Sequence, residues 1–141
     1  MRTFTQKDKT MLIVDRGEKL VESITRQFTD LNLRGGLITG LGALTEVELG
    51  FYHLHKKAYD RKMFPKEYEL LSLIGNIAVK DGKPFVHVHA VLGDEDFSTF
   101  GGHLFEARVA VTAELSVVPF EFAPVRQLNS SIGLALICGE E

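Results

Sequence analysis

The stretch FVHVHAVLGDEDFSTFGGHL, residues 85–104, places two apolar runs on either side of a polar turn that contains glycine. The first run is rich in Val and Leu, which favours a β-strand, and it carries His87 and His89 two positions apart. Side chains at this spacing leave a strand on the same face. His103 begins the second run. If the two runs pair as neighbouring strands, three imidazoles meet on one patch.

Two histidines on one face of an apolar strand are difficult to accommodate as ordinary core residues. A single histidine there usually hydrogen-bonds to the backbone or to a carboxylate, but each additional buried ring nitrogen needs a partner of its own. One shared metal ion satisfies both rings, and three histidines are the ligand set of an open zinc site. Neutral imidazole also suits iron, nickel or copper. We therefore predict a metal site at His87, His89 and His103, with zinc as the expected ion.

Zinc held by three histidines lowers the pKa of its bound water toward ~7, which makes hydrolase or lyase chemistry available. Such chemistry also needs a general base. The acidic residues 94–96 are interpreted as a solvated turn, and Glu106 is expected on the opposite strand face. Glu69 and Glu114 lie within strand-like runs, and the sequence does not decide whether they reach the site. The catalytic residues therefore remain unknown, and no Ser-His-Asp or Cys-His nucleophile pattern stands out.

Only one segment has a convincing helical period. Its apolar residues recur three or four positions apart and are Leu20, Val21, Ile24, Phe28 and Leu31. Asp15 and Glu18 form an acidic variant of the capping box before it. Asn32 suits the left-handed position that ends a helix. These signals predict one principal helix.

The remaining segments favour β-structure. Strands are expected over residues 11–14, 47–52, 58–64, 68–79, 85–92, 104–118 and 132–137. Asp81 and Gly82 predict a tight hairpin turn, whereas residues 120–129 are expected to form a loop. We predict an α+β fold with a mainly antiparallel, strongly curved sheet of about seven strands and one principal helix.

Two other motifs are assigned to the scaffold. The glycine-rich residues 33–51 lack the spacing of dinucleotide and phosphate loops, so these glycines are expected at bulges and bends. His53 and His55 also share a strand face, but Lys56 and Lys57 follow at once. We expect this second pair to be solvated at an exposed strand end, although an additional ligand or substrate contact stays open.

The composition of the whole chain narrows the class of protein. Its 141 residues, with 45% hydrophobic and 25% charged residues, predict a single domain over residues 1–141. The net charge of -3 argues against nucleic-acid binding through charge alone. The single Cys138 fits a reducing compartment. Neither a signal peptide nor a membrane-spanning stretch is recognisable, so a cytoplasmic protein without a membrane partner is expected.

Several motifs together resemble the PPC domain, the plants and prokaryotes conserved domain. They are TGLGAL at 39–44, YELLSLIGN at 68–76, HVH at 87–89, GD at 93–94 and GGHL at 101–104. The resemblance covers nearly the whole chain and implies a compact α/β fold with a central antiparallel sheet, assembled as a homotrimer. For bacterial and archaeal members it implies zinc bound by three histidines, which correspond to His87, His89 and His103.

The resemblance also implies a kinship with nuclear proteins of plants, in which the domain follows AT-hook motifs that bind DNA. This chain has no Arg-Gly-Arg-Pro core; the nearest sequence is DRGE at residues 15–18. Direct DNA binding therefore lacks support in the sequence. The expected function is that of a stand-alone, zinc-binding PPC protein with a DNA-associated or regulatory role by kinship. The alternative is a zinc-dependent hydrolase or lyase acting on an unknown small molecule bound at the metal.

Overall fold

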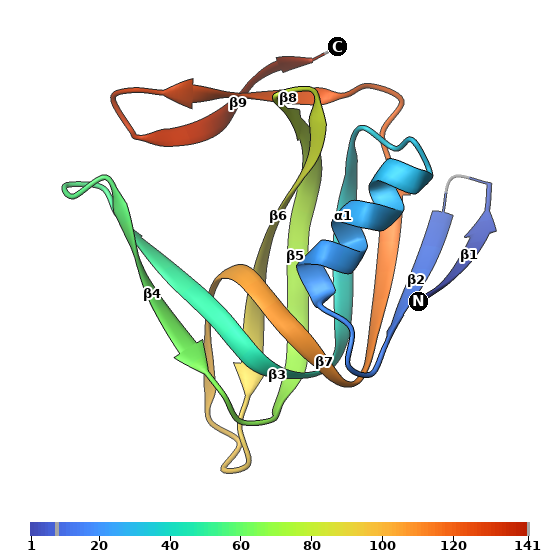
Figure 1. Cartoon of the computed structure of the whole chain (residues 1–141), viewed down its shortest axis with the longest axis vertical. Helices are drawn as coiled ribbons and strands as arrows, with labels where there is room; N and C mark the ends of the chain where they lie inside the picture. The colour runs from blue at the N-terminus through green and yellow to red at the C-terminus, as the bar shows by residue number, and fades with distance from the viewer. Residues whose placement is uncertain (8, 141) are drawn as a thin grey trace.

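The computed structural model describes residues 1–7 and 9–140, and these contain one helix and nine strands (Figure 1). The elements in chain order are β1 (Arg2–Gln6), β2 (Lys9–Asp15), α1 (Leu20–Asp30), β3 (Gly36–His53), β4 (Ala58–Phe64), β5 (Tyr68–Lys80), β6 (Lys83–Gly93), β7 (Thr99–Pro119), β8 (Pro124–Asn129) and β9 (Leu134–Glu140). The expected combination of one helix with strands is thus present, and β-structure dominates.

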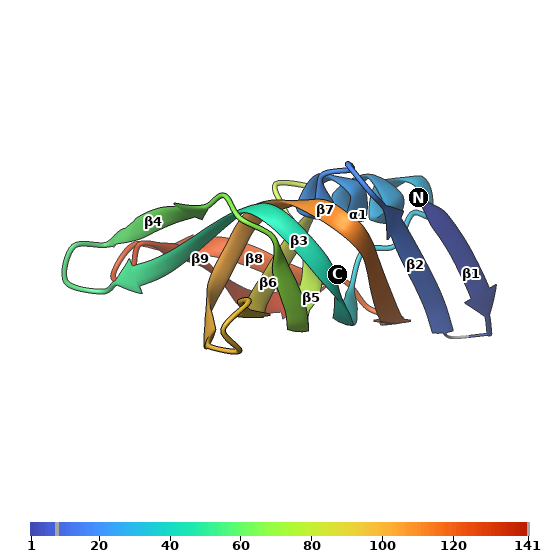
Figure 2. The ribbon, with the colours of Figure 1, turned by 90° about the horizontal axis from the view of Figure 1, so that it is seen from below.

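The nine strands form one sheet that curls back on itself. The order is β1-β2-β7-β3-β5-β8-β9, while β4 pairs with β3, and β6 pairs with both β5 and β7. The pairs β3–β5, β5–β6, β6–β7 and β7–β3 therefore close a circuit. Figure 2 shows the arched sheet, with the β1–β2 and β3–β4 hairpins at opposite ends. The strong curvature expected from the sequence is present.

The prediction of about seven strands in a mainly antiparallel sheet was incomplete. The sheet is larger and mixed, because β8 meets β5 in parallel at Val79 and Val125. The strand β1 was missed because its residues, RTFTQ, carry too little apolar alternation to indicate a strand. The strand β8 was mistaken for a loop because of its proline. Pro124 is the first residue of β8, where a missing N–H is tolerated.

The turn predictions on both sides of the long strands are confirmed. Asp81 and Gly82 have φ angles of 52° and 74°, so the β5–β6 hairpin uses the positive backbone angles of a tight turn. Asn32 has a φ of 51°, as expected just beyond the end of α1. Local sequence therefore determines these reversals.

The helix α1 lies over one face of the sheet and packs its apolar stripe against the core (Figure 1). Leu20, Ile24 and Phe28 are buried with the core residues of β2, β3, β5, β6 and β7. Burial of side chains of this size contributes about 1.5–3 kcal/mol each. The strands that carry the three histidines are thereby held on a packed core.

The helix starts later than the capping pattern indicated. The Glu18 carboxylate accepts the Asp15 N–H at 3.0 Å, as half of a capping box would, but α1 begins at Leu20 and its N-cap residue makes no side-chain cap. The cap comes from β7 instead, because the Glu106 carboxylate accepts the N–H groups of Val21 and Glu22 at 2.8 and 3.1 Å. Within the described part of the chain, no helix has the length and apolarity needed to cross a membrane.

Candidate metal centre

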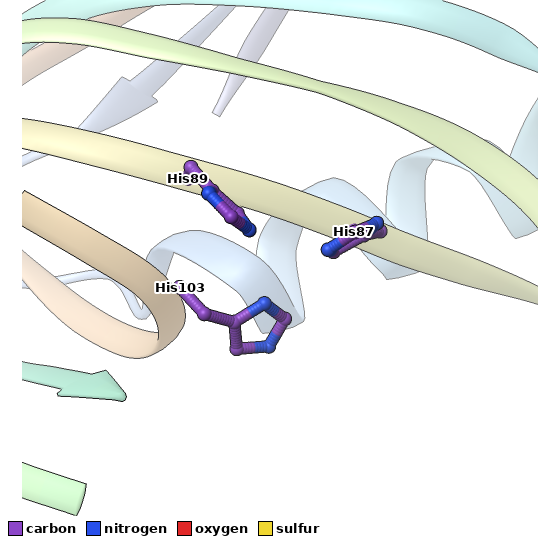
Figure 3. A group of neighbouring side chains, drawn as sticks. All are labelled: His87, His89 and His103. Atoms are coloured by element: carbon purple, nitrogen blue, oxygen red, sulfur yellow. The ribbon is translucent and has the colours of Figure 1, made fainter. Parts of the chain in front are cut away.

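The three predicted histidines lie together in the structure. His87 and His89 are on β6, His103 is on β7, and the antiparallel pairing places His89 directly opposite His103. Figure 3 shows the three rings turned toward a common space between the two strands. One ring nitrogen from each residue lies within 4.8 Å of the others. The predicted pairing of the two runs is confirmed, and the distances suit a shared metal ion.

Glycines bring the neighbouring backbones close to this patch. A Cβ atom at Gly75 of β5 would collide with the carbonyl oxygen of His87, and one at Gly101 of β7 would collide with that of Ala90. Side chains at these two positions would push β5 and β7 away from β6. Gly101, two residues before His103, therefore allows β7 to lie close to β6 at the histidine patch.

Burial keeps two of the rings in the form that binds metals. His87 and His103 are half-buried, and burial lowers the pKa of each imidazole to about 4. A second cause for His87 is the nearby Arg126 cation, and for His103 it is the neighbouring histidines His87 and His89. Both rings are therefore neutral near pH 7 and offer a lone pair to a cation.

An unsatisfied nitrogen supports the fit of these residues to a metal ion. The Nδ1 atom of His103 is buried and has no hydrogen-bond partner within the described residues. Unpaired buried polar atoms are rare because each one loses its water without compensation. His103 is also held between the rings of Tyr59 and Phe105, at centroid distances of 5.1 and 4.7 Å. The donor set of three imidazoles matches the preference of zinc and related divalent metals.

A cavity of about 630 Å³ opens beside the histidines. Its lining includes His87, His103, Tyr59, Phe105 and Arg126. Burial raises the pKa of Tyr59, so its phenol stays protonated at neutral pH. The cluster is therefore accessible to a small molecule.

Arg126 is the site residue that the sequence did not reveal. It lies on β8, far from the histidines along the chain, in the segment that was expected to be a loop. One guanidinium nitrogen, Nη2, donates to Nδ1 of His87 at 3.1 Å and to Oδ1 of Asn76 at 2.9 Å. Its only local signal is a charged side chain between Val125 and Gln127, which is too weak to indicate a site.

The acidic residues near the histidines in sequence do not join them in space. Residues 94–96 form the predicted turn, where Oδ1 of Asp94 accepts the N–H groups of Asp96 and Ser98 at 3.0 and 2.9 Å. This turn and Glu69 line a different cavity of about 800 Å³. Glu106 is engaged with the helix. Within residues 1–7 and 9–140, the candidate metal-binding group consists of the three histidines and contains no carboxylate.

The second histidine pair is separate from the metal cluster. His53 ends β3, and its Nε2 lies 2.7 Å from Oδ2 of Asp60 on β4. His55 is exposed in the following turn, with its ring 5.6 Å from that of His53. The pair is at an exposed strand end, as predicted, and His53 additionally contacts a carboxylate.

Comparison with solved structures gives close matches over almost the full chain. A crystal structure described as that of a candidate DNA-binding protein from Bacteroides thetaiotaomicron has a TM-score of 0.94 and 26% identity, covering 97% of this chain and 96% of that chain. A plant- and prokaryote-conserved (PPC) protein from Pyrococcus horikoshii has a TM-score of 0.87 and 33% identity, covering 98% and 95%. A metal-containing protein from Archaeoglobus fulgidus has a TM-score of 0.87 and 32% identity, covering 98% and 97%.

The sequence comparisons agree with this fold. No curated protein sequence matches the chain. The family model of the Plants and Prokaryotes Conserved (PCC) domain, the domain called PPC above, matches residues 1–121. This range contains all three clustered histidines and most of the curled sheet. The chain therefore belongs to the Plants and Prokaryotes Conserved domain family.

Proposed function

We propose that this protein is a PPC-domain protein whose residues 1–141 form one domain, and that it binds zinc through His87, His89 and His103. The observation that carries the proposal is the convergence of three ring nitrogens within 4.8 Å, and the buried, unpaired Nδ1 of His103 supports it. The metal-containing relative from Archaeoglobus fulgidus supports it. When bound, zinc on three histidines would supply Lewis acidity and a coordination position for water or a ligand.

Metal analysis of the untagged protein tests this proposal. After equilibration with zinc and removal of free metal, we expect about one zinc per chain. The His89→Ala variant should lower zinc affinity by at least tenfold, since even the loss of an outer-shell partner costs about 10–100-fold. His55→Ala is the matched control, because His55 is an exposed histidine outside the cluster. A wild type without stoichiometric metal would contradict the proposal.

We also propose that the chain assembles as a homotrimer. One support is the family resemblance. The other is a set of large apolar side chains that are exposed on the sheet, among them Leu41, which is 55% exposed, and Ile74, which is 62% exposed. Contiguous exposed apolar surface commonly marks an interaction surface. Ile74 pairs directly with His89 across β5 and β6, so this surface begins next to the metal centre.

A DNA-associated role is proposed only as an indirect one, through another protein. The support is that the similar protein from Bacteroides thetaiotaomicron is described as a candidate DNA-binding protein. The net charge of -3 does not supply the electrostatic attraction that direct binding needs. Salt-dependent retention of the purified protein on duplex DNA would contradict this restriction.

We further propose that the protein works in a reducing compartment such as the cytoplasm, and the single Cys138 supports this.

The alternative function is that of a zinc-dependent hydrolase or lyase. The specific observation in its favour is the cavity of about 630 Å³ at the histidines, since a purely structural zinc site is closed by a fourth protein ligand. The described residues bring no carboxylate into the histidine group. We therefore place ligand binding at the metal ahead of catalysis.

A further inference from the structure

Arg126 is a buried cation without a carboxylate partner in the described part of the chain. Its side chain is only 8% exposed, and its hydrogen bonds go to the Ala135 carbonyl, the Asn76 side chain and the His87 ring, at 3.0, 2.9 and 3.1 Å. Its Nε–H is buried and has no acceptor among these residues. Buried charges are normally paired because desolvation is expensive. A negative partner is therefore missing.

Arg61 shows how the same chain treats a guanidinium that has a structural role. Its Nε and Nη2 atoms hold the Glu48 carboxylate in a bidentate pair at 2.7 and 2.6 Å, although Arg61 is the more exposed of the two arginines. The matching edge of Arg126 carries the unpaired Nε and the Nη2 that points to His87. This edge of a guanidinium has the geometry to bind both oxygens of a carboxylate. In Arg126 the edge donates only to neutral acceptors, so it can still bind a carboxylate that comes from outside the chain.

Metal binding would release one of the bonds that Arg126 makes. A neutral imidazole has a single lone pair, and in the structure Nδ1 of His87 accepts a hydrogen bond from Nη2 of Arg126. If the other ring nitrogen ligates a metal, Nδ1 carries the proton; if Nδ1 ligates, its lone pair is used. In both cases the bond from Arg126 is lost. The guanidinium is then left with a free donor at the edge of the metal centre.

The walls of the cavity match a small anion with an apolar part. Arg126 and Lys80 contribute positive charge, Asp81 in the hairpin turn is the acidic side chain in the lining, and Phe85 lies under the guanidinium at 5.4 Å. Leu134 and several other apolar residues complete the lining. Phosphate would be matched by charge but not by these apolar walls.

We propose that Arg126 recognises a small organic carboxylate that binds at the open coordination position of the histidine-bound metal. This inference rests on the proposed metal site and adds the chemical class of its ligand. Arg126 acts as a binding residue, with its guanidinium supplying the charge-assisted hydrogen bonds and the metal supplying the second anchor. The carboxylate also provides the counter-charge that the buried guanidinium otherwise lacks.

The test uses the full chain loaded with cobalt(II), whose visible absorption reports changes in its coordination. Acetate is titrated as the probe, and acetamide serves as its neutral counterpart. We expect a saturable spectral change with acetate and none with acetamide at the same concentrations. In Arg126→Gln, the cobalt stoichiometry should be unchanged while acetate binds roughly tenfold or more weakly, since hydrogen bonds to charged groups contribute at this level.

Two further variants make the outcome decisive. Arg61→Gln removes the same charge near His103 but from a guanidinium already paired with Glu48, so acetate binding should match the wild type. Arg126→Met preserves apolar volume and replaces Arg126→Gln if the latter does not fold. Failure of the wild type to bind cobalt would overturn the metal site itself. Cobalt binding without a saturable acetate effect, or with equal affinity in the Arg126 variants, would overturn this inference alone.

Discussion

At the scale of single residues, the site depends on rings that remain neutral in the folded chain. Burial lowers the pKa of His87 and His103 to about 4, from an ordinary value of 6.5. Protonation is thus opposed in the folded state but not in the unfolded chain. At a pH between these two pKa values the unfolded chain binds more protons than the folded chain, so acidification favours unfolding. The same protons compete with a metal for the ring nitrogens.

The stability of the metal-free protein is therefore expected to fall as the pH is lowered from about 6.5 toward 4. The contribution of these neutral rings to the free energy of unfolding is fully present above pH 6.5 and is lost as the pH falls toward the pKa of the folded state. Thermal unfolding of the metal-free protein across this range measures the effect. A variant with both His87→Asn and His103→Asn should show a shallower loss of melting temperature with acid. An unchanged slope in that variant would exclude these rings as the cause.

At the scale of elements, the pairing of β6 with β7 produces the site, and β7 also anchors the helix. The carboxylate of Glu106 caps α1 three residues after His103. Because successive side chains alternate across a strand, one strand serves the metal patch on one face and the helix on the other. The helix start and the histidine patch are consequently connected through a single strand.

Replacing Glu106 with Ala should destabilise the fold by about 1 kcal/mol, because the N–H groups of Val21 and Glu22 lose their acceptor. Glu106→Gln keeps an oxygen acceptor but loses the charge, so an intermediate loss is expected. Urea unfolding measures both effects. Glu121→Ala, an exposed carboxylate outside any helix, is the control and should leave stability unchanged. Equal stability of Glu106→Ala and the wild type would refute the capping role.

At the scale of the whole molecule, the described residues leave one face of the sheet without the cover that α1 gives to the other. Met11, Leu41 and Ile74 come from β2, β3 and β5, line one shallow groove and are exposed by 43%, 55% and 62%. Alternation along β2 and β5 places Leu12, next to Met11, and Leu73, next to Ile74, in the core. A second copy of the chain is the partner that the proposed trimer supplies for this groove.

Light scattering coupled to size-exclusion chromatography should give a mass of three times the 15.7 kDa of the chain. Ile74→Lys should shift the protein toward monomers, since a buried lysine in an apolar interface is costly. Phe97→Lys is the control, because Phe97 is 93% exposed in the turn before β7 and lies outside the groove. A monomeric wild type at micromolar concentration would refute the trimer.

The sequence by itself determined the features that depend on short-range geometry. The shared face of His87 and His89, the Asp81-Gly82 hairpin and the left-handed Asn32 all follow from local backbone rules, and each is present. The length and composition of the Phe85–Leu104 stretch likewise indicated two strands and a turn, although the strand β7 extends beyond it. The metal candidate was therefore readable before any tertiary structure.

Only the tertiary structure decided which distant residues complete the site. Arg126 reaches His87 because β8 pairs in parallel with the C-terminal end of β5 at Val79, a contact that no local periodicity encodes. Glu106 likewise caps α1 although the two are far apart in the sequence. Strand pairing between distant segments depends on the packing of the whole core, whereas turns and side-chain alternation depend on neighbouring residues. For this reason the three histidines were found from the sequence, and the cation beside them was not.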